Sequence, residues 1–323
     1  MKLFYIILLL IVNSVCSFGQ VGGESIYSFL RLNMSSNYAS LGGFIPSADM
    51  RGVNSVFSNP ALVDSLDNMS ASLNYISYVS DINYGSMLYG AKVGSDLMIT
   101  GGVEFLNYGD FEELDDVGNQ LGTFNCKEHV LFVSFSRNIL KNLRFGATFS
   151  TIFSHLETYR SFGIASHFGL IYKIDNQKLT IGFSAMNLGC QLTKYAYERE
   201  KLPLDLRFGI SKILLHAPLR FSFTLHDLQC PKLDDDFMRS FVNHIILSTE
   251  LFPESPVSVK AGFNFQTHND LYVSDLTPFP GFSFGVDVRL KRFSVQYSRR
   301  CLSPAASANF FTAEIFISNF AVR

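Results

Sequence analysis

Residues 142–153 read NLRFGATFSTIF, and this stretch decides the fold. Apolar side chains occupy every second position from Leu143 to Phe149, and small or polar residues alternate with them from Arg144 to Ser150. Successive side chains of a β-strand point to opposite faces, so a period of two predicts a strand with one apolar and one polar face. The chain therefore contains at least one amphipathic strand.

The same alternation recurs along most of the chain. It returns in residues 178–185, 204–210, 219–225, 257–265 and 282–290. Soluble β-sandwiches also alternate, but their strands average about five or six residues. Residues 70–320 instead divide into roughly fourteen strands of about ten residues, which is typical of a tilted outer-membrane strand. The prediction is an all-β fold, a transmembrane antiparallel β-barrel.

The connections between these strands support a barrel. If the first strand rises from the periplasm, the periplasmic connections are short and the outer ones long, as in outer-membrane barrels. The short ones are residues 94–96, 138–142, 175–178, 214–218, 252–256 and 290–292, and the long ones are 109–127, 189–202, 227–238, 267–280 and 299–309. One outer connection, residues 80–82, is short and fits poorly. The polar face would then line the lumen with Arg144, Lys178, Arg207, Arg220, Lys260, Asp287 and Arg289.

The N-terminus has the features of a secretory signal. Lys2 precedes an apolar run, Leu3–Val12, that is about half the ~20 residues a membrane-spanning helix needs. We expect a signal peptide over residues 1–19, with cleavage before Gln20; a lipoprotein site at Cys16 is the alternative. No later stretch is apolar enough for a helical span, and the 32 Phe and 14 Tyr, without Trp, suit a lipid-facing β-structure with aromatic girdles. The predicted location is the cell outer membrane.

Several classes of function are disfavoured. The net charge of −2 argues against a nucleic-acid surface. Neither the histidines nor Cys126, Cys190, Cys230 and Cys301 have the spacing of a metal site, so we expect no metal and no cofactor; bridges between the cysteines remain open. Residues 281–285 match the G-x-S-x-G lipase motif, but the alternation continues through Ser283, so no catalytic residue and no enzyme are predicted. Two acidic clusters, residues 110–116 and 234–236, fall in outer loops.

The segment before the barrel, residues 20–66, does not alternate and is rich in Gly, Ser and Asn. A lumen of this size is wider than its own side chains can fill, so this segment is predicted to form an N-terminal plug. Gly42 and Gly43 supply one tight bend, and Asn59, Pro60 and Ala61 form a turn that holds the plug in place. The barrel itself would span residues 67–323.

The last strand, residues 310–320, ends in an aromatic residue. Phe320 is interpreted as the assembly signal that the barrel-assembly machinery reads; the alternative is an ordinary apolar strand.

Two stretches of the plug, YASLGG at residues 38–43 and SVFSNPAL at residues 55–62, are similar to the plug signature of barrels related to long-chain fatty-acid transporters. Within that superfamily, YSFLRL at residues 27–32 and YISYVSDINYGSMLYG at residues 75–90 resemble the PorQ-like outer-membrane components of the type IX (Por) secretion system of Bacteroidetes. The resemblance covers residues 24–93; beyond them only the alternation is shared. It implies a non-enzymatic scaffold for protein secretion, with a surface protein of that system, outer-membrane lipid and the barrel-assembly machinery as partners. The alternative is an outer-membrane transporter of hydrophobic small molecules.

Overall fold

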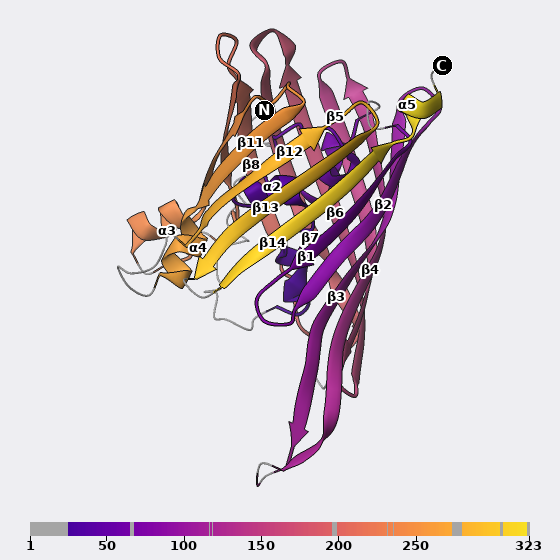
Figure 1. Ribbon diagram of the computed structural model, residues 1–323, viewed down its shortest axis with the longest axis vertical. Coiled ribbons are helices and arrows are strands. Elements are labelled where there is room, and N and C mark those ends of the chain that lie inside the picture. Colours follow the sequence, from indigo (N-terminus) through magenta and orange to yellow (C-terminus); the bar gives the residue numbers. More distant parts are fainter. Residues whose placement is uncertain are drawn as a thin grey trace, which may run out of the picture.

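Fourteen antiparallel strands form a closed barrel in the computed structural model (Figure 1). The structure describes residues 25–64, 68–115, 117, 119–195, 199–230, 232–234, 236–272, 280–303 and 306–321. Each strand pairs with its sequence neighbours, and β1 pairs with β14 in a register that joins Ser70 to Phe316 and Ser77 to Asn309. Closure leaves neither terminal strand with an open edge along this seam. The predicted fold class is confirmed.

The longest strands are β3 to β7, and β1 and β8 to β12 are the shortest. They are β1 Ser70–Ser77, β2 Asn83–Val93, β3 Leu97–Leu114, β4 Gln120–Leu140, β5 Leu143–Leu156, β6 Tyr159–Ile174, β7 Leu179–Thr193, β8 Asp205–Ile213, β9 Leu219–Leu225, β10 Ile245–Leu251, β11 Val257–Asn264, β12 Phe282–Arg289, β13 Phe293–Ser303 and β14 Ala306–Phe316. The helical elements are η1 Ser28–Arg31, α2 Ser36–Ser40, η2 Val53–Phe57, η3 Pro60–Leu62, η5 Asp175–Gln177, α3 Phe237–Asn243, α4 Phe265–Leu271 and α5 Ser318–Ala321. No helix of the described residues is long and apolar enough to cross a membrane.

The alternation sorts side chains between the outside and the inside of the barrel. In β5, Phe145, Phe149 and Phe153 are exposed outward, whereas Arg144 and Ser150 are buried inside. The inner face of β5 is therefore mostly polar, as predicted, although Ile152 is buried there too. The inner faces of β2, β3 and β4 carry buried apolar side chains that the sequence analysis did not predict, among them Leu88, Met98, Leu106 and Val130. Of the expected luminal charges, Arg207, Arg220, Lys260 and Asp287 are buried and Arg289 pairs with Asp287. Lys178 is an exception: it follows η5 in a left-handed turn, lies exposed at the rim and pairs with Glu254.

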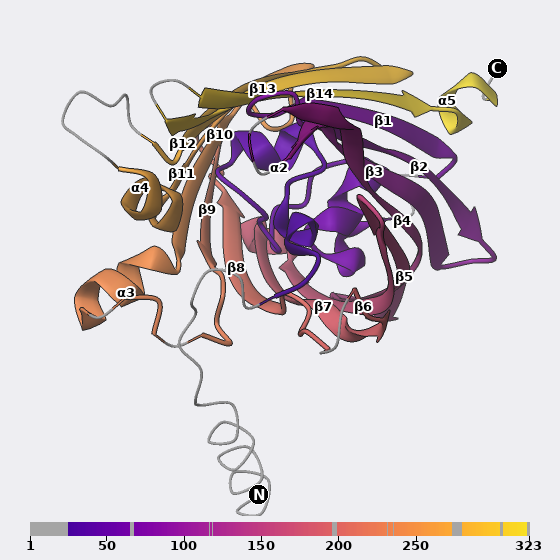
Figure 2. The same ribbon diagram turned by 90° about the horizontal axis from the view of Figure 1, so that it is seen from below.

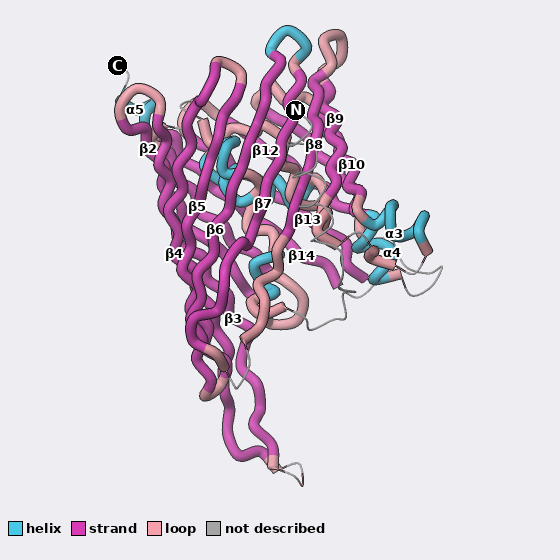
Figure 3. Tube along the Cα trace, turned by 180° about the vertical axis from the view of Figure 1, so that it is seen from behind, coloured by secondary structure: helices cyan, strands magenta, loops and turns pink. Residues whose placement is uncertain are grey.

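The two ends of the barrel differ in their connections. One end, the short-turn end, carries the turns at residues 94–96, 141–142, 175–178, 214–218, 252–256 and 290–292. The other, the long-loop end, carries α3, α4 and a hairpin that projects beyond the barrel (Figures 1 and 3). Two predicted long loops are wrong: most of residues 109–127 continue β3 and β4, and most of residues 299–309 continue β13 and β14. Cross-strand hydrogen bonds persist there although the apolar alternation stops.

The N-terminal segment lies inside the barrel (Figure 2). We call residues 25–64 the luminal segment. It starts at the long-loop end, where Ser25 bridges to Lys201, and reaches the short-turn end, where Asp64 pairs with Arg144. α2, η2 and η3 are buried throughout, whereas only Phe29 is buried in η1, so most of the segment forms a core that the wall encloses. The predicted signal peptide and its cleavage site lie outside the described residues.

The C-terminal strand is shorter than predicted. β14 ends at Phe316, because Phe316 pairs with the first residue of β1 and no strand residue of β1 lies beyond it. Phe320 lies in the short helix α5 instead. Its role as an assembly signal stays a prediction, without the strand conformation that was expected for it.

Candidate functional site: the barrel interior

Asn59 fixes the luminal segment to two strands of the wall. Its Oδ1 accepts a hydrogen bond from the Ala61 amide at 2.9 Å and so caps η3, which Pro60 opens at its first position. Its Nδ2 reaches the carbonyl oxygens of Leu170 in β6 at 3.3 Å and Phe183 in β7 at 3.1 Å. Asn59 is fully buried, so these bonds satisfy groups that water cannot reach. The turn predicted from the sequence is thus a contact between the segment and the wall.

Inward-facing glycines let the segment touch the wall backbone to backbone. A Cβ on Gly146 of β5 would lie 2.3 Å from the carbonyl carbon of Pro60. A Cβ on Gly262 of β11 would lie 2.0 Å from the carbonyl carbon of Leu41, beside Gly42, whose positive φ of 88° suits glycine. The sequence placed Gly146 on the polar face but gave no reason for a glycine there. The contact supplies that reason.

All five residues of the predicted plug motif lie inside the barrel and are buried: Gly42, Gly43, Asn59, Pro60 and Ala61. That they block permeation stays a prediction.

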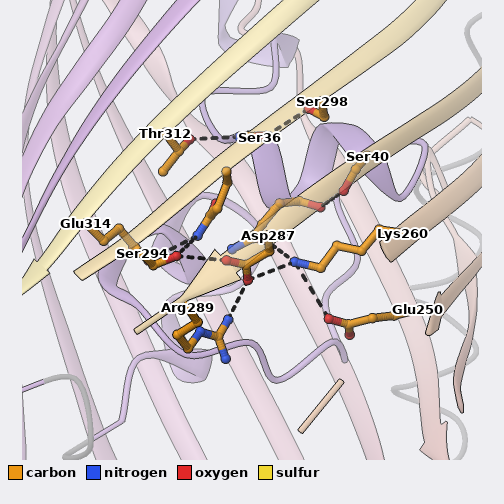
Figure 4. A network of polar contacts seen from close by, with 12 residues as sticks. Ser36, Ser40, Glu250, Lys260, Asp287, Arg289, Ser294, Ser298, Thr312 and Glu314 are labelled. Carbon is orange, nitrogen blue, oxygen red and sulfur yellow. Dashed lines mark hydrogen bonds and ion pairs between the residues drawn. The ribbon is translucent and has the colours of Figure 1, made fainter. Parts of the chain in front are cut away.

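A band of buried charges crosses the interior toward the short-turn end (Figure 4). Lys260 Nζ lies 3.3 Å from Asp287 Oδ2 and 3.7 Å from Glu250 Oε1, and it also contacts Asn37 of the luminal segment. Arg220 Nη1 pairs with Glu250 Oε2 at 2.7 Å. Buried charges are tolerated when they are paired and hydrogen-bonded, as these are. These charges make this part of the lumen unfavourable for binding an apolar molecule.

The luminal segment also bonds to the seam between β1 and β14. The Asn54 Nδ2 donates to Ser72 Oγ of β1 at 2.7 Å and to Glu314 Oε1 of β14 at 2.8 Å. The Ser36 amide donates to Thr312 Oγ1 of the same strand, β14, at 3.1 Å. One segment therefore holds both strands at which the barrel closes.

A small apolar pocket lies between the luminal segment and the wall. It is lined by Leu30, Leu32, Met34, Phe44, Val56 and Phe57 of the segment, and by Glu104, Val130, Phe132, Thr148, Ser150, His167, Met186, Asn187 and Arg207 of the wall. Phe57 and Phe132 pack edge to face, and the Arg207 guanidinium lies 4.1 Å from the centre of the Phe44 ring. Its volume is about 40 Å³, which is close to that of one water molecule. Ligand pockets measure about 300–1,000 Å³, so a ligand would need the segment to move.

A wider vestibule of about 990 Å³ opens at the short-turn end. Charged groups of both signs line it, among them Asp49, Arg51, Lys173, Arg220 and Arg289. It ends at the luminal segment, where the Arg220 Nη2 donates to the Asp49 carbonyl oxygen at 3.0 Å. The interior thus has a polar vestibule, a charged band and a small apolar pocket.

At the long-loop end, Arg31 holds the start of the luminal segment. Its Nη1 lies 3.0 Å from Asp227 Oδ1, and His226 Nδ1 lies 3.0 Å from Asp227 Oδ2. Burial raises the pKa of Asp227, but the hydrogen bond from His226 and the charge of Arg31 outweigh it, so the pKa is lowered below its usual value. Asp227 is therefore ionised at neutral pH.

The residues considered for catalysis or metal binding do not form such sites. Ser283 lies within the continuous strand β12, paired with Gly262 and Arg300, so the strand–turn–helix context of a lipase nucleophile is not present around it. Among the described residues, no group of three His, Cys, Asp or Glu side chains is placed to hold a metal ion. All four cysteines of the predicted mature chain are unpaired thiols.

Comparisons with known proteins show which solved structures share this barrel fold. No protein-family profile and no curated protein matches the chain. Among solved structures, the toluene transporter TodX of Pseudomonas putida is similar, with 12% identity, a TM-score of 0.53 and coverage of 88% of this chain and 96% of that one. The monoaromatic hydrocarbon channel CymD is similar as well, with 11% identity, a TM-score of 0.52 and coverage of 90% and 97%. At this identity the likeness shows the shared barrel fold.

Proposed function

We propose that this protein carries small hydrophobic molecules across the outer membrane. The apolar pocket between the luminal segment and the wall carries the proposal, because it gives such a molecule an apolar place to bind inside the barrel. Phe57 and Phe132 would contact the ligand, and movement of the luminal segment would open the pocket. The barrels TodX and CymD, described as a toluene transporter and a monoaromatic hydrocarbon channel, support this reading by their fold.

The test is uptake of labelled toluene by cells that carry the protein in their outer membrane. Val130→Trp should fill the pocket and abolish uptake, since Val130 is buried and lines it. Val133→Trp is the matched control, because Val133 lies in the same strand and is exposed outward. Heat-modifiable migration checks that both variants fold. If cells with the native protein take up no more toluene than cells without it, or if Val130→Trp takes up as much as Val133→Trp, the proposal is refuted.

A second candidate function is that of a scaffold in type IX secretion. It is favoured by the filled lumen: the luminal segment is held by Asn59 and the charged band, and the apolar pocket beside it measures about 40 Å³. The resemblance of residues 27–32 and 75–90 to PorQ-like barrels supports the same reading. Deleting the gene should then stop export of type IX cargo while toluene uptake is unchanged, and the opposite result would favour transport.

A further inference from the structure

The hairpin formed by β3 and β4 extends beyond both neighbouring strands. β2 pairs with β3 only as far as Asn107, and β5 pairs with β4 only as far as Cys126. Residues 110–114 and 120–125 continue to pair with each other. We call residues 110–125 the arm; it projects from the long-loop end (Figures 1 and 3). Within the described part of the chain, no third strand pairs with the arm, so both its edges are open.

Open edges of this kind are templates for another strand. Unpaired backbone N–H and C=O groups along an edge can each bond to an added chain. A two-stranded ribbon is marginally stable by itself in water, so a third strand would stabilise it. On one face of the arm Phe111 stacks on Phe124 at 5.4 Å, and Phe111 is 42% exposed. Val117 at the tip is 85% exposed. The arm thus presents apolar side chains and unpaired backbone together.

The charge of the arm selects the partner. Residues 110–125 contain five acidic residues and no Lys or Arg. Asp115 closes the tip, since its Oδ1 accepts from the amides of Val117 and Asn119. Asp110, Glu112 and Glu113 lie exposed along the paired part of β3. Like charges would oppose pairing of two arms from two copies of this chain, whereas a basic strand would be attracted.

We infer that the arm binds an extended, Lys- or Arg-rich segment of another protein, which adds to one of its edges as a third strand. The inference does not rest on the transport proposal, because the arm lies outside the barrel and away from the pocket. It needs only the open edges, the exposed Phe stack and the negative charge.

The test uses the full protein in phosphatidylcholine nanodiscs and three synthetic ten-residue peptides. One alternates Lys with Thr and Val, the second has the same charge but is interrupted by Pro, and the third carries Glu in place of Lys. Hydrogen exchange of residues 110–125 is measured by mass spectrometry, and affinity by fluorescence anisotropy. We expect the alternating basic peptide to slow exchange in one arm strand at least fivefold and to bind more weakly as salt rises. The interrupted and acidic peptides should leave exchange unchanged.

Charge variants give the control. Glu112→Lys with Glu113→Lys should weaken binding of the basic peptide at least tenfold. Glu157→Lys with Glu200→Lys makes the same charge change at the long-loop end, but outside the arm, and should leave binding of the basic peptide unchanged. If the alternating and the Pro-interrupted basic peptides slow exchange of the arm equally, the peptides bind by charge alone. That result would overturn strand addition. If lipopolysaccharide vesicles without peptide slow exchange of the arm, its partner is lipid and the inference is overturned. If Val117→Cys forms crosslinks between arms that increase with protein concentration, the partner is a second copy of this chain and the inference is overturned as well.

Discussion

At the residue scale, Asn59 shows how one side chain links the luminal segment to the wall. Asn59→Ala would remove the cap of η3 and one donor to the carbonyl oxygens of Leu170 and Phe183, so we expect a loss of about 1–3 kcal/mol in the free energy of unfolding. Ser58→Ala is the matched control, because Ser58 is equally buried and its Oγ has no hydrogen-bond partner among the described residues. Denaturant unfolding in detergent measures both. If Asn59→Ala and Ser58→Ala unfold at the same denaturant concentration, the Asn59 contacts contribute nothing to stability.

Gly146 tests the close approach of backbone to backbone. Gly146→Ala would place a Cβ against Pro60, whose main chain is held by the turn at Asn59, so either the segment or the wall must shift. Gly101→Ala is the control, since the nearest heavy atom to its Cβ would be 3.9 Å away. We expect Gly146→Ala to lower the thermal midpoint and Gly101→Ala to leave it or raise it slightly. A drop of the same size in both variants would contradict a specific contact.

The ion pair of Arg31 and Asp227 predicts a dependence on pH. The pKa of Asp227 is lowered in the folded state, so its ionised form contributes stability above the unfolded-state pKa of about 4 and that contribution is lost as pH falls further. Hydrogen exchange of residues 25–32 should therefore be constant from pH 7 to 5, after correction for intrinsic rates, and become faster below about pH 4. Asp227→Asn should show the faster exchange already at pH 7. If Asp227→Asn exchanges at the native rate at pH 7, Asp227 does not hold the start of the luminal segment.

At the element scale, the alternation predicted the strands because apolar side chains on the outside of the barrel alternate with buried side chains, many of them polar, on the inside. Phe149 lies in the middle of β5 and is 54% exposed, so Phe149→Arg should cost about 2–4 kcal/mol at the bilayer midplane. Leu215→Arg, in an exposed turn at the short-turn end, should cost about 0–1 kcal/mol. Folding titrations into lipid vesicles compare the two. Similar costs would mean that β5 does not face lipid.

The same alternation could not predict the arm. Outside the apolar band, a strand needs hydrogen bonds but no apolar face, so the acidic residues 110–116 resembled a loop while β3 and β4 continued to pair. The residues after Arg299 were misassigned for the same reason, since β13 continues to Ser303 through its pairing with β14. The interior contacts escaped prediction as well. They depend on which glycine faces which turn of the luminal segment, and this is set by the three-dimensional register.

At the scale of the whole molecule, the wall and the luminal segment have separable roles. The wall closes through its own ladders, including the rungs that join β1 to β14 over the full length of β1. The luminal segment adds contacts to that seam through Asn54 and Ser36 and fills the space that the ladders enclose. The barrel should therefore still close without the segment, although less stably.

Deletion of residues 24–63, with the signal peptide retained, tests this division. It would leave Lys260 paired with Asp287 and Arg220 paired with Glu250, but open to water, so the emptied lumen should fill with water and conduct ions. We expect single-channel conductance in planar bilayers, and sensitivity of cells to bulky antibiotics, to rise sharply. Replacing residues 109–126 by an Asn-Gly turn removes the arm without opening the lumen and should leave conductance unchanged. If the deletion variant inserts and is heat-modifiable yet conducts no better than the intact protein, the long-loop end closes the lumen, and the luminal segment does not serve as a plug.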